Sequence, residues 1–373
     1  IDYTDSEDGV FLLEKAATNL ITYSEDFSNS YWSKTRATIT SNQIISPDGT
    51  LNADLLTITD TSENYVQTNV SLSVSGTKQT VSCFVKKGTN NFAHILLWDT
   101  SSNGSRQWFD LENGIVGSST SFGSGISVGG ASIENYGNGW YRCVVVFNSS
   151  FSSVRTRISA SNGDGQTNGT IGKTIYIWGY QCEANSSYAS SYIPTQGTTQ
   201  TRVQETANGS GNSEVFNDSQ GVLFANISAL ADDLTNRVIT ISDGTTTNRV
   251  QIYLDSLNGA TCNIISNNSG QGAISYIGDV KLMTKAALKY ELNNVSFWVN
   301  GFRIGLDTNS IMPNGLKDIG FDNGVGTSPF YGKTKEIAYY DTVLTDLELE
   351  TLTSYRTWEA MVKELNLNII HNE

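Results

Sequence analysis

The chain has 373 residues, a formal net charge of −14, and charged side chains at only 16% of positions. That length exceeds one typical domain and predicts two or three. A surface this acidic repels phosphate backbones, and no basic stripe with interleaved aromatic residues occurs, so nucleic-acid binding is disfavoured. No apolar run of about 18 residues is present, so no membrane insertion is expected.

The net negative charge also bears on which ligands the protein can bind. A uniformly anionic polysaccharide would meet long-range repulsion unless local Lys or Arg residues or a bridging cation intervened, so neutral ligands fit the overall balance better.

Short strand-like runs dominate as far as about residue 340. In chain order they include residues 79–88, 92–99, 140–147, 174–180, 236–244, 248–255 and 295–305. Turn dipeptides separate many of them, namely Asp48-Gly49, Asn103-Gly104, Asn113-Gly114, Asp243-Gly244 and Asn300-Gly301. Closely spaced strands with tight turns indicate antiparallel sandwiches rather than βαβ units. The predicted fold class is therefore all-β, with two tandem antiparallel β-sandwiches and a short C-terminal α-helix.

Domain boundaries follow from changes in pattern. Residues 196–218 are polar and mostly lack apolar periodicity, which predicts a first domain at 1–203, a linker at 204–211 and a second domain at 212–343. Residues 344–367 predict a helix, because Thr345 and Glu348 form a capping-box pattern before an apolar stripe. The stripe consists of Leu352, Tyr355, Trp358, Val362 and Leu365. It could pack on the second domain, or contact another subunit or a neighbouring module.

Two groups of motifs resemble known families. The runs "LLEKAATNLITYSEDFSNSYW", "SPDGTLNADLLT" and "GNGWYRCVVVF", with the ending "IYIWGYQCEANSSYASSYIPTQGTTQTR", resemble carbohydrate-binding-module-like jelly-roll domains of bacteriophage tail and structural proteins. The runs "VSFWVNGFRIG" and "GKTKEIAYYDTVLTDLELETL" resemble the laminin G/concanavalin A-like sandwich. This resemblance implies recognition of sugars or surfaces on a virion.

Motifs for catalysis are missing. The sequence has two histidines, His94 and His371, and contains no GxSxG elbow, HExxH pair or Walker loop. The ExDxxE strand of concanavalin-like glycoside hydrolases is absent too. A non-catalytic protein is therefore expected, with a polysaccharide depolymerase kept as a minor alternative.

Binding by stacking needs aromatic faces and hydrogen-bonding neighbours, because a pyranose has apolar C–H faces and polar hydroxyls. On a regular strand Tyr176, Trp178 and Tyr180 would share one face. Residues 94–110 read as a hairpin with aromatic faces on both of its strands. The candidate carbohydrate-binding residues are Trp98, Arg106, Trp108, Tyr176, Trp178, Tyr180 and Trp298. Packing in a core remains the alternative for each, and for Trp298 packing against the C-terminal helix is favoured.

The sequence gives only weak evidence for a metal site or for a disulfide. Asp243 and Asp322 lie in Asp/Asn-rich loops that could hold a structural Ca²⁺ ion or simply form turns. The four cysteines lack metal-ligand spacing, so free buried thiols are favoured over one disulfide in the first half.

Together these patterns predict a non-catalytic glycan-recognition or adhesion component of a bacteriophage virion, in the tail or decorating the capsid. Its expected partners are a polysaccharide or cell-surface glycan and other virion proteins, and a homo-oligomer is compatible. The expected location is the virion surface, with a secreted or cell-surface bacterial protein as the alternative. A purely structural spacer or assembly protein is the rival function.

Overall fold

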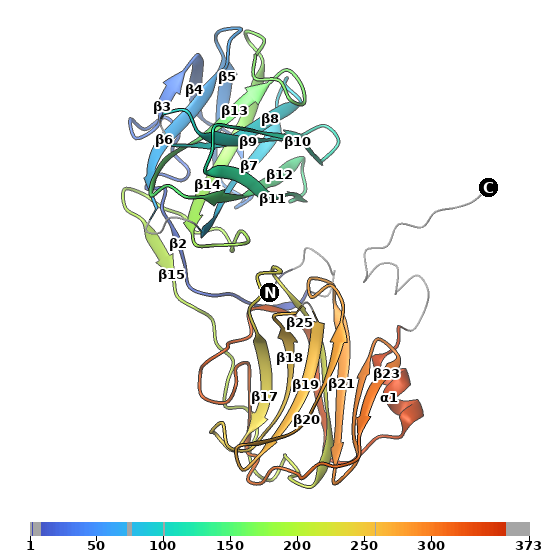
Figure 1. Ribbon diagram of the computed structural model, residues 1–373. Helices are drawn as coiled ribbons and strands as arrows, with labels where there is room; N and C mark the ends of the chain where they lie inside the picture. Colours follow the sequence, from blue (N-terminus) through green and yellow to red (C-terminus); the bar gives the residue numbers. More distant parts are fainter. Residues whose placement is uncertain (1, 3–8, 73–76, 100, 258, 356–373) are drawn as a thin grey trace, which may run out of the picture. The chain divides into compact units, whose positions relative to one another are not determined.

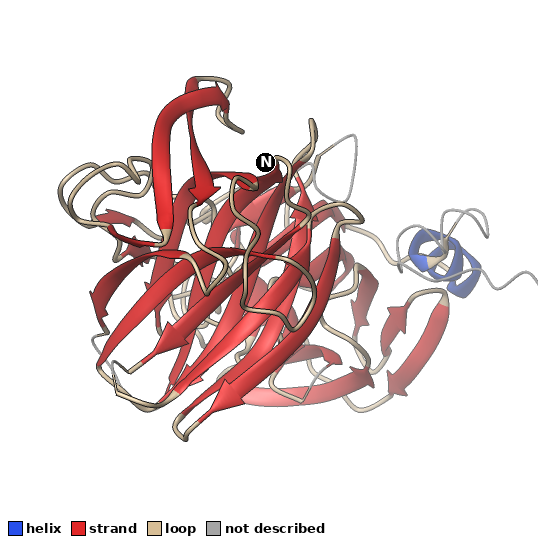
Figure 2. Ribbon diagram, turned by 90° about the horizontal axis from the view of Figure 1, so that it is seen from above, coloured by secondary structure: helices blue, strands red, loops and turns tan. Residues whose placement is uncertain are grey.

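The computed structural model describes residues 2, 9–72, 77–99, 101–257 and 259–355. It divides into two compact units, one formed by Ala16–Val203 and the other by Ile1–Lys15 with Gln204–Glu373. Both units are built from antiparallel strands, and the described residues include one short helix, α1 (Asp346–Thr353), coloured blue in Figure 2. The all-β fold class is confirmed. No helix among the described residues is long and apolar enough to cross a membrane.

The first unit, Ala16–Val203, is a sandwich of two six-stranded sheets (Figure 1). The first sheet, here called the β8 sheet, has the order β10 (Ile115–Phe122), β9 (Gly104–Asp110), β8 (Phe92–Trp98), β13 (Ser153–Ser161), β6 (Tyr65–Ser71) and β3 (Ser33–Thr35). The second, called the β14 sheet, has the order β11 (Ile126–Asn135), β12 (Trp140–Ser149), β7 (Thr77–Lys87), β14 (Thr174–Ala184), β5 (Leu51–Ile58) and β4 (Ala37–Ile45). Strands β2 (Ala17–Asn19) and β15 (Gln200–Arg202) pair beside them.

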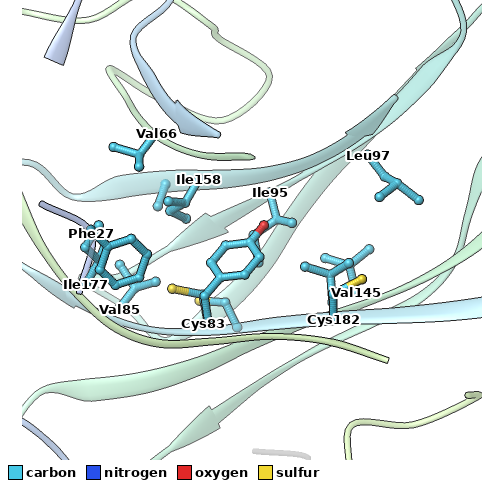
Figure 3. Close-up of a cluster of buried hydrophobic side chains, with 14 of the residues drawn as sticks. Phe27, Val66, Cys83, Val85, Ile95, Leu97, Val145, Ile158, Ile177 and Cys182 are labelled. Atoms are coloured by element: carbon cyan, nitrogen blue, oxygen red, sulfur yellow. The ribbon is translucent and has the colours of Figure 1, made fainter. Parts of the chain in front are cut away.

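Alternating apolar residues from both sheets form the core of this sandwich. Figure 3 shows Val66, Ile95, Leu97 and Ile158 of the β8 sheet facing side chains of the β14 sheet, such as Val85. The remaining labelled side chains are Phe27, Cys83, Val145, Ile177 and Cys182. All four cysteines of the chain are buried and free, which confirms the expectation of unpaired thiols.

The second unit is also a sandwich of two sheets. Its six-stranded sheet has the order β1 (Phe11–Leu13), β25 (Gly332–Tyr340), β16 (Gln220–Ala229), β21 (Thr284–Glu291), β22 (Val295–Val299) and β23 (Phe302–Asp307). The facing sheet has the order β20 (Ser269–Ile277), β19 (Gly259–Ser266), β18 (Arg249–Asp255), β17 (Arg237–Ser242) and β24 (Asp318–Gly320).

The expected boundaries need two corrections. Residues 1–15 belong to the second sandwich rather than the first, because β1 completes the edge of its sheet by pairing Phe11 with Thr334 of β25. Residues 204–211 are not a free linker. Their backbone and side chains bond to the second sandwich: the Gly209 amide donates to the carbonyl of Ile319, and Asn208 Nδ2 donates to Asp322 Oδ2.

Helix α1 begins as expected, since Thr345 and Glu348 form a complete capping box. It ends at Thr353, whereas the sequence pattern predicts a helix over 344–367. Three residues of the expected apolar stripe, Trp358, Val362 and Leu365, lie outside the described residues. Leu349 of the helix is buried in a cluster with Trp298, Val222 and Phe224, so this part of the helix packs on the second sandwich.

Candidate functional site

The aromatic stripe of β14 does not alternate as a regular strand would. Trp178 pairs with Phe84 of β7 and the next register pair is Gln181 with Ser82, so a β-bulge interrupts the strand. Gly179 in the bulge has φ of 62°, a conformation that favours glycine. The extra residue turns Tyr180 into the sandwich core, where its hydroxyl lies 2.6 Å from Thr156 Oγ1. Tyr180 is therefore a core residue and not part of a surface platform.

Trp178 remains on the outer face of the β14 sheet but is covered there. Only 3% of its surface is exposed, and its ring centroid lies 4.7 Å from that of Tyr192 and 5.1 Å from that of Phe84. The segment of residues 185–196, here called the tail segment, follows β14 and supplies Tyr192. Arg142 Nη2 holds the tail segment against the sheet by donating to the carbonyl of Ser190 at 2.7 Å. The stripe is thus the base of a second small core, in which Tyr176 is a partly buried neighbour.

The outer face of the β8 sheet has a different character. Strand register places Arg155 beside Trp98, and Arg157 in line with Leu96 and Arg106. We call this surface the arginine face. It is made up of Glu63, Tyr65, Gln67, Asn69, His94, Trp98, Arg106, Trp108, Arg155 and Arg157. Three of the predicted residues, Trp98, Arg106 and Trp108, are brought together on it.

Glu63 is the electrostatic centre of the arginine face. Its Oε1 lies 3.3 Å from Arg106 Nη2, 3.4 Å from Arg157 Nη1 and 3.6 Å from His94 Nε2. Burial raises the pKa of Glu63, but the nearby His94 and the charges of the two arginines outweigh it and hold the pKa below its usual value. Burial, together with the nearby guanidinium groups, lowers the pKa of His94 against the pull of Glu63.

Aromatic rings and guanidinium groups interleave on the same surface. The guanidinium of Arg157 lies 3.9 Å from the ring centroid of Tyr65 and 4.9 Å from that of Trp98. Arg155 lies 5.4 Å from the Trp98 centroid on the same face. Such cation–π contacts hold the guanidinium groups in place and leave their N–H edges available for other acceptors. Trp98 is only partly buried.

Trp108, in contrast, is not an exposed platform. Only 1% of its surface is exposed, and its indole Nε1 donates to the carbonyl of Gln166 at 2.6 Å. The loop that carries Gln166 therefore covers it. Trp108 supports Arg106, whose guanidinium lies 5.8 Å from its ring centroid.

A surface pocket of about 320 Å³ opens beside Arg155. It is lined by Tyr31, Ser33, Gln67, Thr68, Asn69 and Arg155. The pocket lies where β3 stops, because β3 pairs with β6 only at residues 65–67. Its volume falls in the range of small-ligand sites, and its walls carry hydroxyl, amide and guanidinium groups around one phenol ring.

Several polar atoms of the arginine face are buried without a hydrogen-bond partner among the described residues. They are Gln67 Oε1, Trp98 Nε1, Arg106 Nε, Arg157 Nε and both ring nitrogens of His94. Buried polar groups are normally paired with protein atoms or with ordered water, so these atoms are positions where water or a ligand would complete the hydrogen bonding.

The predicted residues of the second sandwich do not form a site. Trp298 is only 6% exposed, lies in the cluster under α1, and donates from Nε1 to Ser296 Oγ at 3.2 Å. Trp298 therefore packs against the C-terminal helix, which is the alternative that the sequence favours for it.

The two candidate calcium ligands are occupied as turn formers. Asp243 accepts from the backbone amide and the hydroxyl of Thr245, and Asp322 accepts from the Gly324 amide and from Asn208. No group of three or more His, Cys, Asp or Glu side chains that could hold a metal gathers within the part of the chain that the structure describes. These residues do not fit a calcium site.

Sequence reasoning missed Glu63, Gln67, Asn69, Arg155 and Arg157. A signal was present for the arginines, since the run "VRTRIS" places Arg155 and Arg157 two apart on a strand and hence on one face. The net charge of the whole chain concealed this local concentration.

No protein-family model matches the chain, and no curated protein matches it. Among solved structures, Ruminococcus gnavus IT-sialidase CBM40 shares 16% identity over 40% of this chain and 97% of that chain, with a TM-score of 0.34. Mouse laminin alpha1 chain domains LG4-5 share 10% identity over 75% of this chain and 86% of their own, with a TM-score of 0.28.

The heptameric SAP-like pentraxin from Limulus polyphemus shares 12% identity over 40% of this chain and 76% of its own, with a TM-score of 0.34. These are weak likenesses to β-sandwich domains, and they carry no argument about what this chain binds.

Proposed function

We propose that the first sandwich binds a glycan on the arginine face without cleaving it. The observation that carries the proposal is the pocket lined by Arg155, Gln67 and Asn69, together with the partly buried Trp98, whose ring centroid lies 5.4 Å from the guanidinium of Arg155. A sugar offers apolar C–H faces for a ring and hydroxyls for amide and guanidinium groups, and this surface supplies both kinds of partner.

Binding without catalysis is supported by the state of Glu63. A glycosidase acid needs a carboxyl with a raised pKa, paired with a second carboxylate across the scissile bond. The pKa of Glu63 is lowered instead, and its carboxylate is engaged by Arg106, Arg157 and His94. It is placed to organise the binding face rather than to donate a proton.

The wider setting is part of the same proposal. The motifs at both ends of the first sandwich resemble those of phage tail and structural proteins, which supports a role in adhesion at a virion surface. One site of this size binds a sugar weakly, so repeated copies on a particle would be needed for firm attachment.

The experiment compares two tryptophans of the same sandwich on an array of neutral and acidic oligosaccharides. Trp98→Ala removes the ring of the arginine face and is expected to weaken binding at least about 10-fold. Trp178→Ala removes a covered ring of the opposite face, so its folded fraction should bind as the original protein does. If no oligosaccharide binds to the unaltered chain, or if Trp98→Ala binds normally, the proposal is wrong.

A further inference from the structure

The arginine face carries more positive charge than the chain itself neutralises. Three guanidinium groups, those of Arg106, Arg155 and Arg157, lie on one side of the β8 sheet. Glu63 approaches Arg106 and Arg157. Arg155 has no carboxylate within ion-pairing distance among the described residues; its Nε donates to the amide oxygen of Asn69 at 2.9 Å.

This local surplus of positive charge contrasts with the net negative charge of the chain. The chain has 37 acidic and 23 basic residues, so carboxylates to neutralise a guanidinium are plentiful elsewhere. Like charges on neighbouring positions of a sheet destabilise it unless a counter-charge is present. His94 does not supply the counter-charge, because an imidazole is either neutral or cationic and burial lowers its pKa, which favours the neutral form.

The geometry at Arg155 indicates which anionic group would fit beside it. The bond from Nε to Asn69 and the contact with the Trp98 ring fix the plane of the guanidinium. Arg155 lines the pocket together with Gln67, whose Oε1 is buried and unpaired. A guanidinium fixed through Nε still has its two Nη groups, which match the two oxygens of a carboxylate with parallel hydrogen bonds.

We propose that the glycan bound here is an acidic one and that Arg155 receives the carboxylate of a sugar ring seated in the pocket. This inference rests on the proposed function and names the ligand class for the same site. It reverses the expectation of a neutral ligand that the net charge alone favours, since a local cluster of arginines dominates the field within a Debye length. The repulsion from the acidic remainder of the chain then acts mainly on the rate of encounter.

The test uses the full chain and pairs of probes that differ only in charge. Polygalacturonate oligosaccharides, their methyl esters and neutral galactan oligosaccharides are compared with sulfated dextran by calorimetric titration. The unaltered chain should bind the free acid at least about 10-fold more tightly than its ester, and the advantage should shrink as salt is added.

Variants locate the effect. Arg155→Gln should abolish the preference for the acid over the ester, and Arg155→Lys should retain part of that preference, because a charge remains but the planar fork is lost. Lys173→Gln, which removes an exposed positive charge of the same sandwich that does not line the pocket, should keep the preference. Melting temperatures establish that each variant is folded.

The outcomes separate the two proposals. Equal binding of acid, ester and galactan would overturn the acidic ligand while leaving glycan binding in place. Binding of sulfated dextran without the carboxylate probes, or an unchanged preference in Arg155→Gln, would also overturn it. An array and titrations without any bound sugar would overturn both.

Discussion

The two outer faces of the first sandwich both carry aromatic side chains, yet only one is left open. On the β14 sheet the tail segment folds back over Trp178 and is held there by hydrogen bonds: Arg142 donates to the carbonyl of Ser190, and the Ile193 amide donates to Gln181 Oε1. On the β8 sheet Trp98 lies among arginines, and several polar atoms have no partner in the described chain.

The difference teaches that an aromatic stripe on a strand does not by itself define a binding platform. Whether such a stripe is accessible to a ligand depends on whether a neighbouring segment of the chain folds back over it. The second sandwich makes the same point, since Trp298 lies under helix α1 in an apolar cluster. A covered aromatic ring contributes to stability, and a partly exposed ring flanked by guanidinium groups remains for a ligand.

The largest expected effect is on the covered face. Trp178→Ala should lower the free energy of unfolding of the first sandwich by about 3–5 kcal/mol, because it leaves a cavity between Phe84 and Tyr192. Chemical denaturation followed by tryptophan fluorescence measures this. Five of the seven tryptophans lie in residues 16–203, so the signal reports mainly on this sandwich.

Trp98→Ala is the matched variant on the open face and should cost less stability than Trp178→Ala, because part of the Trp98 ring is already in contact with solvent. Equal losses in the two variants would remove the distinction between a covered and an open face.

Much of the fold could be predicted from the sequence. Strand-length apolar runs and Asn-Gly or Asp-Gly turns are local signals, and the structure has two all-β sandwiches as they indicate. The boundary was missed because the pairing of β1 with β25 joins Phe11 to Thr334, a contact that no local pattern specifies. Likewise, Asn208 and Gly209 are polar linker-like residues in sequence and become ordered only through bonds to distant strands.

The candidate site could be predicted only in part. Alternation correctly placed Trp98 and Arg106 on outer positions of one hairpin, because β8 and β9 pair without a register shift. It misplaced Tyr180 because a bulge at Gly179 adds one residue and reverses the faces beyond it. Glu63 lies outside any strand, and its approach to Arg106 and Arg157 is purely tertiary.

A second, smaller effect tests the charge centre of the open face. Glu63→Gln should lower the stability of the first sandwich by about 2 kcal/mol, because it leaves Arg106, Arg157 and His94 without their anionic partner. The unfolding free energy in urea measures it.

Glu112→Gln is the control, since it breaks the exposed pair with Lys87 in the same sandwich and should change stability by less than about 0.5 kcal/mol. A Glu63→Gln variant as stable as this control would show that Glu63 does not organise the arginine face.

The smallest expected effect is a difference between the β8 and β14 sheets in how their buried titratable groups make stability depend on pH. On the open face the pKa of His94 is lowered by burial, so its contribution to stability is present above the unfolded value of 6.5 and is lost as the pH falls. On the core side of the β14 sheet burial raises the pKa of Asp54, the register partner of Ile177, to about 6. Burial also raises the pKa of Glu25, which lies outside the strands and accepts a hydrogen bond from Tyr192. Their contributions are present at low pH and are lost as the pH rises.

Because these contributions oppose one another, the unfolding free energy of the unaltered sandwich should change little between about pH 7 and pH 5. A variant that removes one group should reveal the contribution of the others. In His94→Gln stability should increase on acidification, since the carboxyls of the β14 sheet then dominate. In Asp54→Asn it should decrease. The slope for Asp54→Asn should not exceed about 1.4 kcal/mol per pH unit, the limit for one proton, and the slope for His94→Gln should stay below about twice that value, because two carboxyls contribute. Slopes of the same sign in both variants would mean that the β8 and β14 sheets do not differ in the charge state that folding favours. The contrast between the two outer faces would then rest on aromatic burial alone.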